Sequence, residues 1–198
     1  MNTKINFRYS WIYNQNLEKW TRNLKHTPKK RFTPREIENY IKAVEKLWEP
    51  KEKKILRELE KIAKLKWKEK EIICYIVGKC IPFSDPLTIP LYKNKNWFID
   101  VLIHELIHQL FTQESNMERA ERSWKFFFNK YNKESHNVKI HIPLHAIHSK
   151  IYHKFFNKKR LKRDIKIMEN YRDYKRAWEI VGKEGYQKII EDFTSRLK

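Results

Sequence analysis

The fold of this 198-residue chain is decided by the stretch Val101-Leu102-Ile103-His104-Glu105-Leu106-Ile107-His108-Gln109-Leu110. It contains the pattern H-E-x-x-H within an apolar run. Residues four apart on a helix lie one turn apart on the same face, so the imidazoles of His104 and His108 can reach one metal ion. Glu105 stands beside that face, where its carboxylate can contact a metal-bound water without binding the metal. The sequence therefore predicts a metal-binding helix.

A core helix with two incidental histidines is the competing interpretation of this stretch. It would place a carboxyl group and two imidazoles in the most apolar helix of the chain, and burial of such groups without partners is unfavourable. The neighbouring Leu106, Ile107 and Gln109 are uncharged, so these three positions add no further charge to the apolar run. We therefore favour the metal site.

A catalytic zinc ion takes three protein ligands and leaves one position for water, so a third ligand is needed. Its source is indicated by the histidines between Ser135 and Lys154, which are His136, His141, His145, His148 and His153. In a helix that starts at Val138, three of these share one stripe with Tyr152. Pro143 also suits the first position of a helix. His145 is helical in either case, so it is the predicted third ligand, and His141 is the alternative.

Other residues of this segment have further candidate roles. His148 or Tyr152 could stabilise the oxyanion of a tetrahedral intermediate. Among the acidic residues downstream of His108, Glu134 is the best alternative metal ligand. A helix whose histidines are simply exposed to solvent is the interpretation without a metal.

The remaining sequence predicts an α+β protein that is mainly helical, since glycine is scarce. Thr33 and Glu36 form a capping-box pattern that starts a helix, and Pro50 marks its end. Glu71 to Val77 is predicted as a buried strand closed by Gly78. Before the motif helix, the sequence predicts a helix over 51–70 and an edge strand over 87–92. The motif helix itself is expected to run from a cap at Asn96 to Thr112. Further helices are expected near 117–131, 142–157, 160–180 and 184–197, and Gly182 and Gly185 punctuate the last two.

Two parts of the chain are distinguished by composition. Residues 1–32 form a polar, irregular and aromatic-rich N-terminal arm, and residues 33–198 form a single domain. The aromatic residues of the arm indicate that part of it packs on the body of the protein. An inhibitory segment that lies across the active-site cleft is the alternative role for the arm.

The net charge of +20 and the pI of about 9.8 indicate either a solvated lysine-rich surface or an anionic partner such as DNA or RNA. Lysine outnumbers arginine, so nucleic-acid contacts would be mainly to phosphate. The spacing of Cys74 and Cys80 does not match a zinc knuckle, and we expect structural thiols in a reducing compartment. With no secretory signal and no apolar run long enough to span a bilayer, the expected location is the cytoplasm, without membrane insertion.

The stretch Val101–Leu110 resembles the signature of the zincin metallopeptidases, and the order of elements over 71–156 is similar to that of small members such as the minigluzincins and the SprT-like proteases. The metzincin continuation is missing, because Phe111 stands where its glycine would be. The resemblance implies a small zincin-like domain with a short sheet, an H-E-x-x-H helix and a second histidine-bearing helix. It also implies that residues 87–92 pair with an extended substrate at a sheet edge.

The activity implied by the resemblance is that of a zinc metalloendopeptidase, a hydrolase that cleaves peptide or protein substrates. Zn²⁺ would be held by His104, His108 and His145, and Glu105 would act as general base. Two alternatives stay open. One is a basic nucleic-acid-binding protein whose zinc site is structural and closed by four protein ligands. The other is a zincin scaffold without catalytic turnover.

Overall fold

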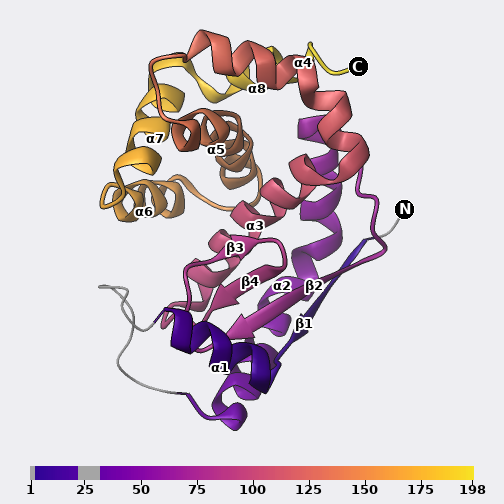
Figure 1. The fold of residues 1–198 in the computed structure, drawn as a ribbon, viewed down its shortest axis with the longest axis vertical. Coiled ribbons are helices and arrows are strands. Elements are labelled where there is room, and N and C mark those ends of the chain that lie inside the picture. Colours follow the sequence, from indigo (N-terminus) through magenta and orange to yellow (C-terminus); the bar gives the residue numbers. More distant parts are fainter. Residues whose placement is uncertain (1–2, 22–31) are drawn as a thin grey trace. The chain divides into compact units, whose positions relative to one another are not determined.

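The computed structural model describes residues 3–21 and 32–198, which belong to two compact units. The first unit comprises Met1–Lys54 and Lys68–Gln109, and the second comprises Ile55–Trp67 and Leu110–Lys198. All the described strands belong to the first unit, and the second is helical. The prediction of a mainly helical α+β chain with a small sheet is confirmed (Figure 1).

The sheet of the first unit has the strand order β1-β2-β4-β3. Its strands are β1 (Lys4–Arg8), β2 (Glu71–Val77), β3 (Phe83–Ser84) and β4 (Leu87–Pro90). β1, β2 and β4 run parallel, and β3 pairs with β4 in the antiparallel direction. The buried strand predicted over 71–77 is therefore confirmed.

One face of this sheet is covered by α1 (Trp11–Trp20) (Figure 1). Tyr75 of β2 and Thr88 of β4 are paired in register, and both contact Tyr13 of α1. The ring centroids of Tyr13 and Tyr75 are 5.0 Å apart, and the Tyr13 hydroxyl lies 2.9 Å from Thr88 Oγ1. The helix is therefore held on the sheet by both an aromatic and a polar contact.

The opposite face of the sheet carries the residues that alternate with Tyr75 and Thr88 along the strands. This face packs on α2 (Pro34–Ala63) and α3 (Lys95–Thr112). The ring of Phe7 in β1 lies 6.0 Å from Phe98 of α3, which in turn lies 5.7 Å from Tyr40 of α2. α3 is thus fixed against the sheet by its first turns.

The N-terminal residues are more regular than the sequence predicted. The irregular arm expected over 1–32 instead contains β1 and α1. The reason is the alternating pattern of β1, in which Ile5 and Phe7 are buried in the sheet. The prediction that aromatic residues of this segment pack on the body is confirmed by Tyr13. The part of the prediction that falls on residues 22–31 lies outside the described residues.

The helix that begins after Thr33 is longer than predicted. Its capping box is confirmed, because Thr33 Oγ1 accepts a hydrogen bond from Glu36 N and Glu36 Oε2 accepts one from Thr33 N. The predicted end at Pro50 is wrong, because α2 continues to Ala63 with the proline inside it. Its buried side chains stay in helical phase across the proline, and their burial outweighs the cost of about 3 kcal/mol for a proline in a helix. They include Ile37, Val44, Trp48, Ile55, Leu59 and Ile62.

Two predictions around the motif helix are corrected. The strand β4 is not at the edge of the sheet, because the chain turns back before it and β3 pairs with its outer side. The motif helix is capped by Asn94 rather than Asn96, since Asn94 Oδ1 accepts hydrogen bonds from Asn96 N at 3.0 Å and Trp97 N at 3.3 Å. The predicted end at Thr112 is confirmed.

In the second unit, α5 is in contact with each of the other helices that follow α3. These are α4 (Glu114–Lys130), α5 (His136–Phe155), α6 (Lys158–Met168), α7 (Arg172–Glu184) and α8 (Tyr186–Thr194). The long helix predicted over 160–180 is divided between α6 and α7. Gly185, with φ 85°, separates α7 from α8 as predicted, whereas Gly182 lies inside α7.

The start of α5 settles the two alternatives for Pro143. Ser135 caps the helix, since its Oγ accepts a hydrogen bond from Val138 N at 3.2 Å. Pro143 is therefore inside the helix, and both His141 and His145 are helical. The described helices include none with the length and apolar character needed to cross a bilayer.

The outer edge of β1 is covered by a carboxylate, and this contact generates a prediction. Glu52 Oε1 of α2 accepts hydrogen bonds from Ile5 N at 2.8 Å and from Trp48 Nε1 at 2.9 Å. We expect Glu52→Ala to lower the free energy of unfolding by about 1–3 kcal/mol, because two donors lose their acceptor. Glu52→Gln should lose less, because its amide oxygen still accepts. Urea denaturation measures both.

Glu49→Ala is the matched control, since Glu49 is an exposed glutamate of the same helix. It should change the free energy of unfolding by less than about 0.5 kcal/mol. Equal losses for Glu52→Ala and Glu49→Ala would show that the contact with β1 is not stabilising.

Candidate metal centre

The helix α3 brings the H-E-x-x-H residues together in the first unit. His104 is buried and His108 is half-buried, and their ring centroids are 5.1 Å apart with an interplanar angle of 66°. The prediction that the motif is helical and places both imidazoles on one face is confirmed. Two neighbouring imidazoles on one rigid helix are suited to bind a single metal ion.

Glu105 lies between these histidines in the sequence and is only 5% exposed. Burial raises the pKa of its carboxyl group to about 8. The group is therefore mostly protonated at pH 7 without a cation near it, and a metal ion at the histidine pair would favour the carboxylate. The protonation state of Glu105 can therefore change near neutral pH.

The two thiols of the first unit are not disulfide-bonded and are buried. Burial, followed by the charge of Glu105, raises the pKa of Cys74 well above its ordinary value and that of Cys80 to about 12. Both therefore stay protonated at neutral pH. Since a metal-binding cysteine must ionise, these residues fit the predicted structural role better than a ligand role.

The helix α5 in the second unit carries His141 on its buried side. His141 Nδ1 lies 2.7 Å from the carbonyl oxygen of Asn137, one turn earlier. With the proton on Nδ1 as donor, the lone pair of the ring is on Nε2. Burial is the main cause that lowers the pKa of His141 to about 4, so the imidazole is neutral at pH 7. Neutral imidazole is the form that binds metal ions.

His145 has a different environment on the same helix. Its ring stacks on the indole of Trp178 in α7, with 4.2 Å between centroids and 11° between planes. Tyr174 of α7 lies beside both histidines, with its ring centroid 4.4 Å from that of His141 and 6.0 Å from that of His145. The assignment of His145 as third ligand stays a prediction, and the structure adds a packing role for its ring.

His148 and Tyr152 are deeply buried and stack on each other, with ring centroids 4.6 Å apart. His148 Nδ1 lies 4.0 Å from Asp164 Oδ2 of α6. Burial, with a smaller contribution from Arg160, lowers the pKa of His148 to about 3. The oxyanion role of His148 and Tyr152 stays a prediction.

The structure also describes the surroundings of the other histidines of α5 and of Glu134, the acidic candidate for a metal ligand. His136 and His153 are exposed, whereas the three between them are buried, so the interpretation of α5 as a helix of solvent-exposed histidines is wrong for its inner stripe. Glu134 accepts hydrogen bonds from Nε and a terminal nitrogen of Arg176, at 2.9 and 2.7 Å. This ion pair already neutralises the carboxylate.

Three residues around these histidines were missed by the sequence analysis. Asn137 contacts His141 through its backbone carbonyl, which every residue type has, so its side chain gave no signal in the sequence. Asp164 is the only acidic residue in the otherwise basic sequence of α6, and it is 3% exposed. Trp178 gave no signal, because its contact with His145 joins residues far apart in the sequence.

Acid should destabilise the protein through its buried histidines. The pKa values of His141 and His148 are lowered to about 4 and about 3, whereas the unfolded chain has the ordinary value near 6.5. Below pH 6.5 the unfolded state binds protons that the folded state does not. The free energy of unfolding should therefore fall from about pH 6.5 toward pH 4, by up to about 1.4 kcal/mol per pH unit for each histidine.

Urea denaturation of the metal-free protein between pH 7 and pH 4 measures this slope. His148→Gln should make it shallower, because one of the titrating groups is removed. His153→Gln, which changes an exposed histidine of the same helix, should leave it as in the wild type. A wild-type slope in the His148 variant would contradict the burial of a neutral imidazole.

Comparison of the chain with known proteins found no relative. No model of a protein family, no curated protein and no solved structure matches the chain. The role of the imidazoles and carboxyl group of α3, and that of the buried histidines of α5, is therefore inferred from these residues themselves.

Proposed function

We propose that the protein is a zinc-dependent metallopeptidase in which His104, His108 and His141 hold the metal and Glu105 acts as general base. The observation that carries this proposal is the pair of imidazoles on α3, of which His104 is buried and His108 is half-buried. Their ring centroids are 5.1 Å apart, and a carboxyl group with a strongly raised pKa stands next to them on the helix. This combination is what the H-E-x-x-H motif requires chemically.

His141 is proposed as the third ligand in preference to His145. Metal-binding histidines commonly donate the N–H of their other nitrogen to a carbonyl group, which fixes the ring and the tautomer. His141 Nδ1 has this partner in the carbonyl of Asn137 at 2.7 Å. The ring of His145 is instead covered by the indole of Trp178.

The residues present fit zinc in number and in chemistry. Imidazole nitrogen is a common ligand of Zn²⁺, and three histidines leave one coordination position for water. The low pKa of His141 keeps its imidazole neutral across the physiological range. When bound, the metal would supply a water of lowered pKa and polarise the substrate carbonyl.

The contribution of the chain to the reaction would be made by the Glu105 carboxylate. It would accept a proton on one of its oxygens as water attacks the peptide carbonyl, and would then deliver that proton to the nitrogen of the leaving amine. Burial raises the pKa of this carboxyl group to about 8 when no cation is near it, so the group can hold a proton, and a metal ion at the histidine pair would favour the carboxylate that accepts one. The proposed substrates are peptides or unfolded segments of proteins.

A reducing location is proposed for the same protein. Cys74 and Cys80 are free and buried, and burial raises the pKa of both. Buried, reduced thiols are typical of proteins in the cytoplasm, and we propose that compartment.

Glu105→Gln tests the role of the general base. The substitution keeps the shape of the side chain and removes its ability to accept the proton. We expect one zinc ion per chain to be kept, and hydrolysis of fluorescent casein to fall by about 10²–10⁴-fold. Zinc is measured by atomic absorption, and Glu118→Gln on the exposed side of α4 is the matched control.

Three results would argue against the proposal. Turnover retained by Glu105→Gln would remove its role as base. Zinc in both proteins with hydrolysis in neither would favour a structural site or an inactive scaffold. A wild-type protein without zinc would exclude the metal centre itself.

Single alanine variants test the ligand set. His108→Ala and His141→Ala should each lose most of the bound zinc, because a two-histidine site binds weakly. His145→Ala should keep zinc and lose stability, since it removes the stacking on Trp178. His153→Ala, at an exposed position of the same helix, should change neither. Loss of zinc from His145→Ala with retention in His141→Ala would reverse the assignment of the third ligand.

A further inference from the structure

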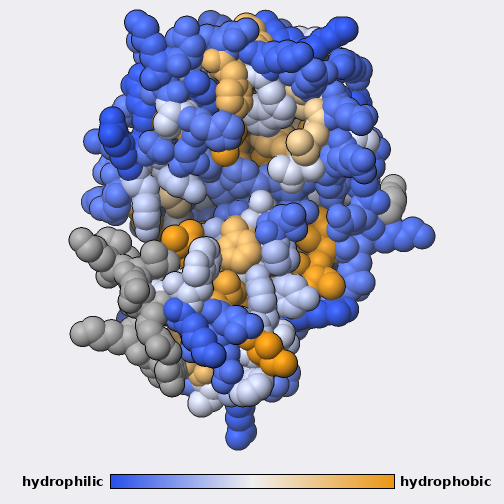
Figure 2. Space-filling view, in the orientation of Figure 1, coloured by the Kyte–Doolittle hydropathy of each residue, from blue (hydrophilic) through white to orange (hydrophobic). Residues whose placement is uncertain are grey.

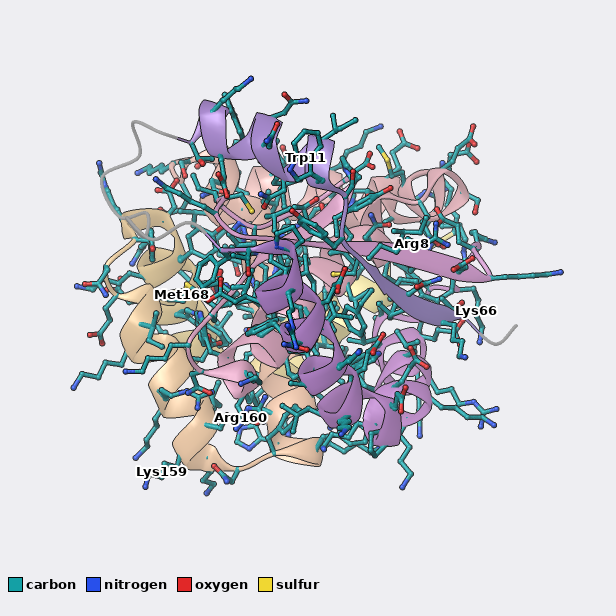
Figure 3. The ribbon with its side chains drawn as sticks, turned by 90° about the horizontal axis from the view of Figure 1, so that it is seen from below. Arg8, Trp11, Lys66, Lys159, Arg160 and Met168 are labelled. Atoms are coloured by element: carbon teal, nitrogen blue, oxygen red, sulfur yellow. The ribbon has the colours of Figure 1, made fainter. Side chains whose placement is uncertain are left out.

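The helix α6 is the most cationic helix of the second unit. Six of its eleven residues are lysine or arginine. The only acidic residue, Asp164, is 3% exposed and faces His148 of α5 rather than solvent. Figure 3 shows Lys159 near the start of α6, with its side chain directed outward, and the corresponding part of Figure 2 is mostly blue.

Four lysines of α6 form one exposed face, which we call the lysine face. With a rotation of 100° per residue, they fall within an arc of about 100°. The rise of 1.5 Å per residue separates each lysine from the one four positions later by about 6 Å along the helix. The members of the lysine face are Lys158, Lys159, Lys162 and Lys166, and all are exposed.

No residue that the structure describes neutralises the charges of the lysine face. Within the described residues, none of the four lysines forms an ion pair, whereas many exposed cations of the same unit do. Lys125 lies 2.7 Å from Glu121, and Arg176 lies 2.7 Å from Glu134. A set of aligned cations without internal partners is available to an external anion.

We propose that the lysine face binds the phosphate backbone of nucleic acid without reading its sequence. Lysine presents a compact point charge that suits phosphate, and it lacks the planar fork with which arginine reads guanine. The regular spacing along one helix suits a partner with regularly repeated charges. The net charge of +20 adds a long-range attraction to such a polyanion.

The packing of α6 favours nucleic acid over an anionic membrane. A helix that lies in a membrane interface exposes apolar side chains between its cations. The exposed arc of α6 contains only lysines, and the apolar Leu161, Ile165 and Met168 are half-buried outside that arc. α6 contacts α5 and α7, and its apolar side chains are half-buried rather than exposed.

The test measures binding of a fluorescein-labelled 20-base-pair DNA duplex to the full chain by anisotropy, with EDTA present and KCl varied from 50 to 300 mM. The variant combines Lys158→Gln, Lys159→Gln, Lys162→Gln and Lys166→Gln. Each lost phosphate contact should reduce the slope of log K against log salt by about 0.9, so the slope should fall by about 3 to 4. Because EDTA is present, the result is independent of the metal centre.

The matched control combines Lys125→Gln, Lys133→Gln, Lys183→Gln and Lys188→Gln, which change four exposed lysines elsewhere in the same unit. It removes the same charge, and its slope should change by less than about 1. The four lysines of α6 changed to arginine should bind as the wild type does, which would confirm that charge at this face is what matters. Circular dichroism compares the folding of all variants.

Two results would overturn the proposal. Equal losses in the α6 variant and the control would mean that only net charge attracts DNA. Unchanged DNA binding in the α6 variant, together with loss of its sedimentation with vesicles of 30% phosphatidylserine and 70% phosphatidylcholine, would assign the lysine face to a membrane.

Discussion

Loss of hydration around ionisable side chains is the constraint under which α3 and α5 are built. Glu105, His141 and His148 are each at most 5% exposed, and burial shifts every one of them toward its neutral form. A carboxylic acid and imidazoles without charge can be kept inside apolar helices, whereas their ions cannot unless a partner is supplied. The apolar packing of both helices is compatible with these residues only because of that neutrality.

Charge is therefore separated between the interior and the surface of this protein. The buried histidines are neutral, and the large positive charge lies on exposed lysines such as those of α6. The two kinds of site suit different ligands. Neutral nitrogen donors suit a metal ion, and exposed ammonium groups suit phosphates. Asp164 belongs to both kinds of environment. Its helix, α6, is rich in exposed cations, but its own side chain is buried near His148.

Features that depend on local sequence were predictable. The capping box of Thr33 and Glu36 and the pairing of His104 with His108 need only neighbours within one or two turns. The helical continuation through Pro50 was not foreseen, because burial of a whole apolar side outweighs a local preference. A helix that runs through Pro143 was one of the two alternatives that the sequence left open.

Non-local contacts account for the rest of the differences. β1 became part of the sheet through its pairing with β2, which lies more than 60 residues later in the chain. β4 lost its expected edge position to the two residues of β3. The neighbours of the candidate ligands on α5, such as Trp178, come from another helix, and no periodic pattern could point to them.

The contact between Glu52 and β1 also has a consequence for association between copies of the protein. β1 is at the edge of a sheet, and its outward N–H groups could accept a strand from another molecule. The Glu52 carboxylate occupies the position at Ile5 N that a carbonyl oxygen of such a strand would take. The carboxylate of α2 thus disfavours the addition of a strand from another copy at this position of the sheet edge.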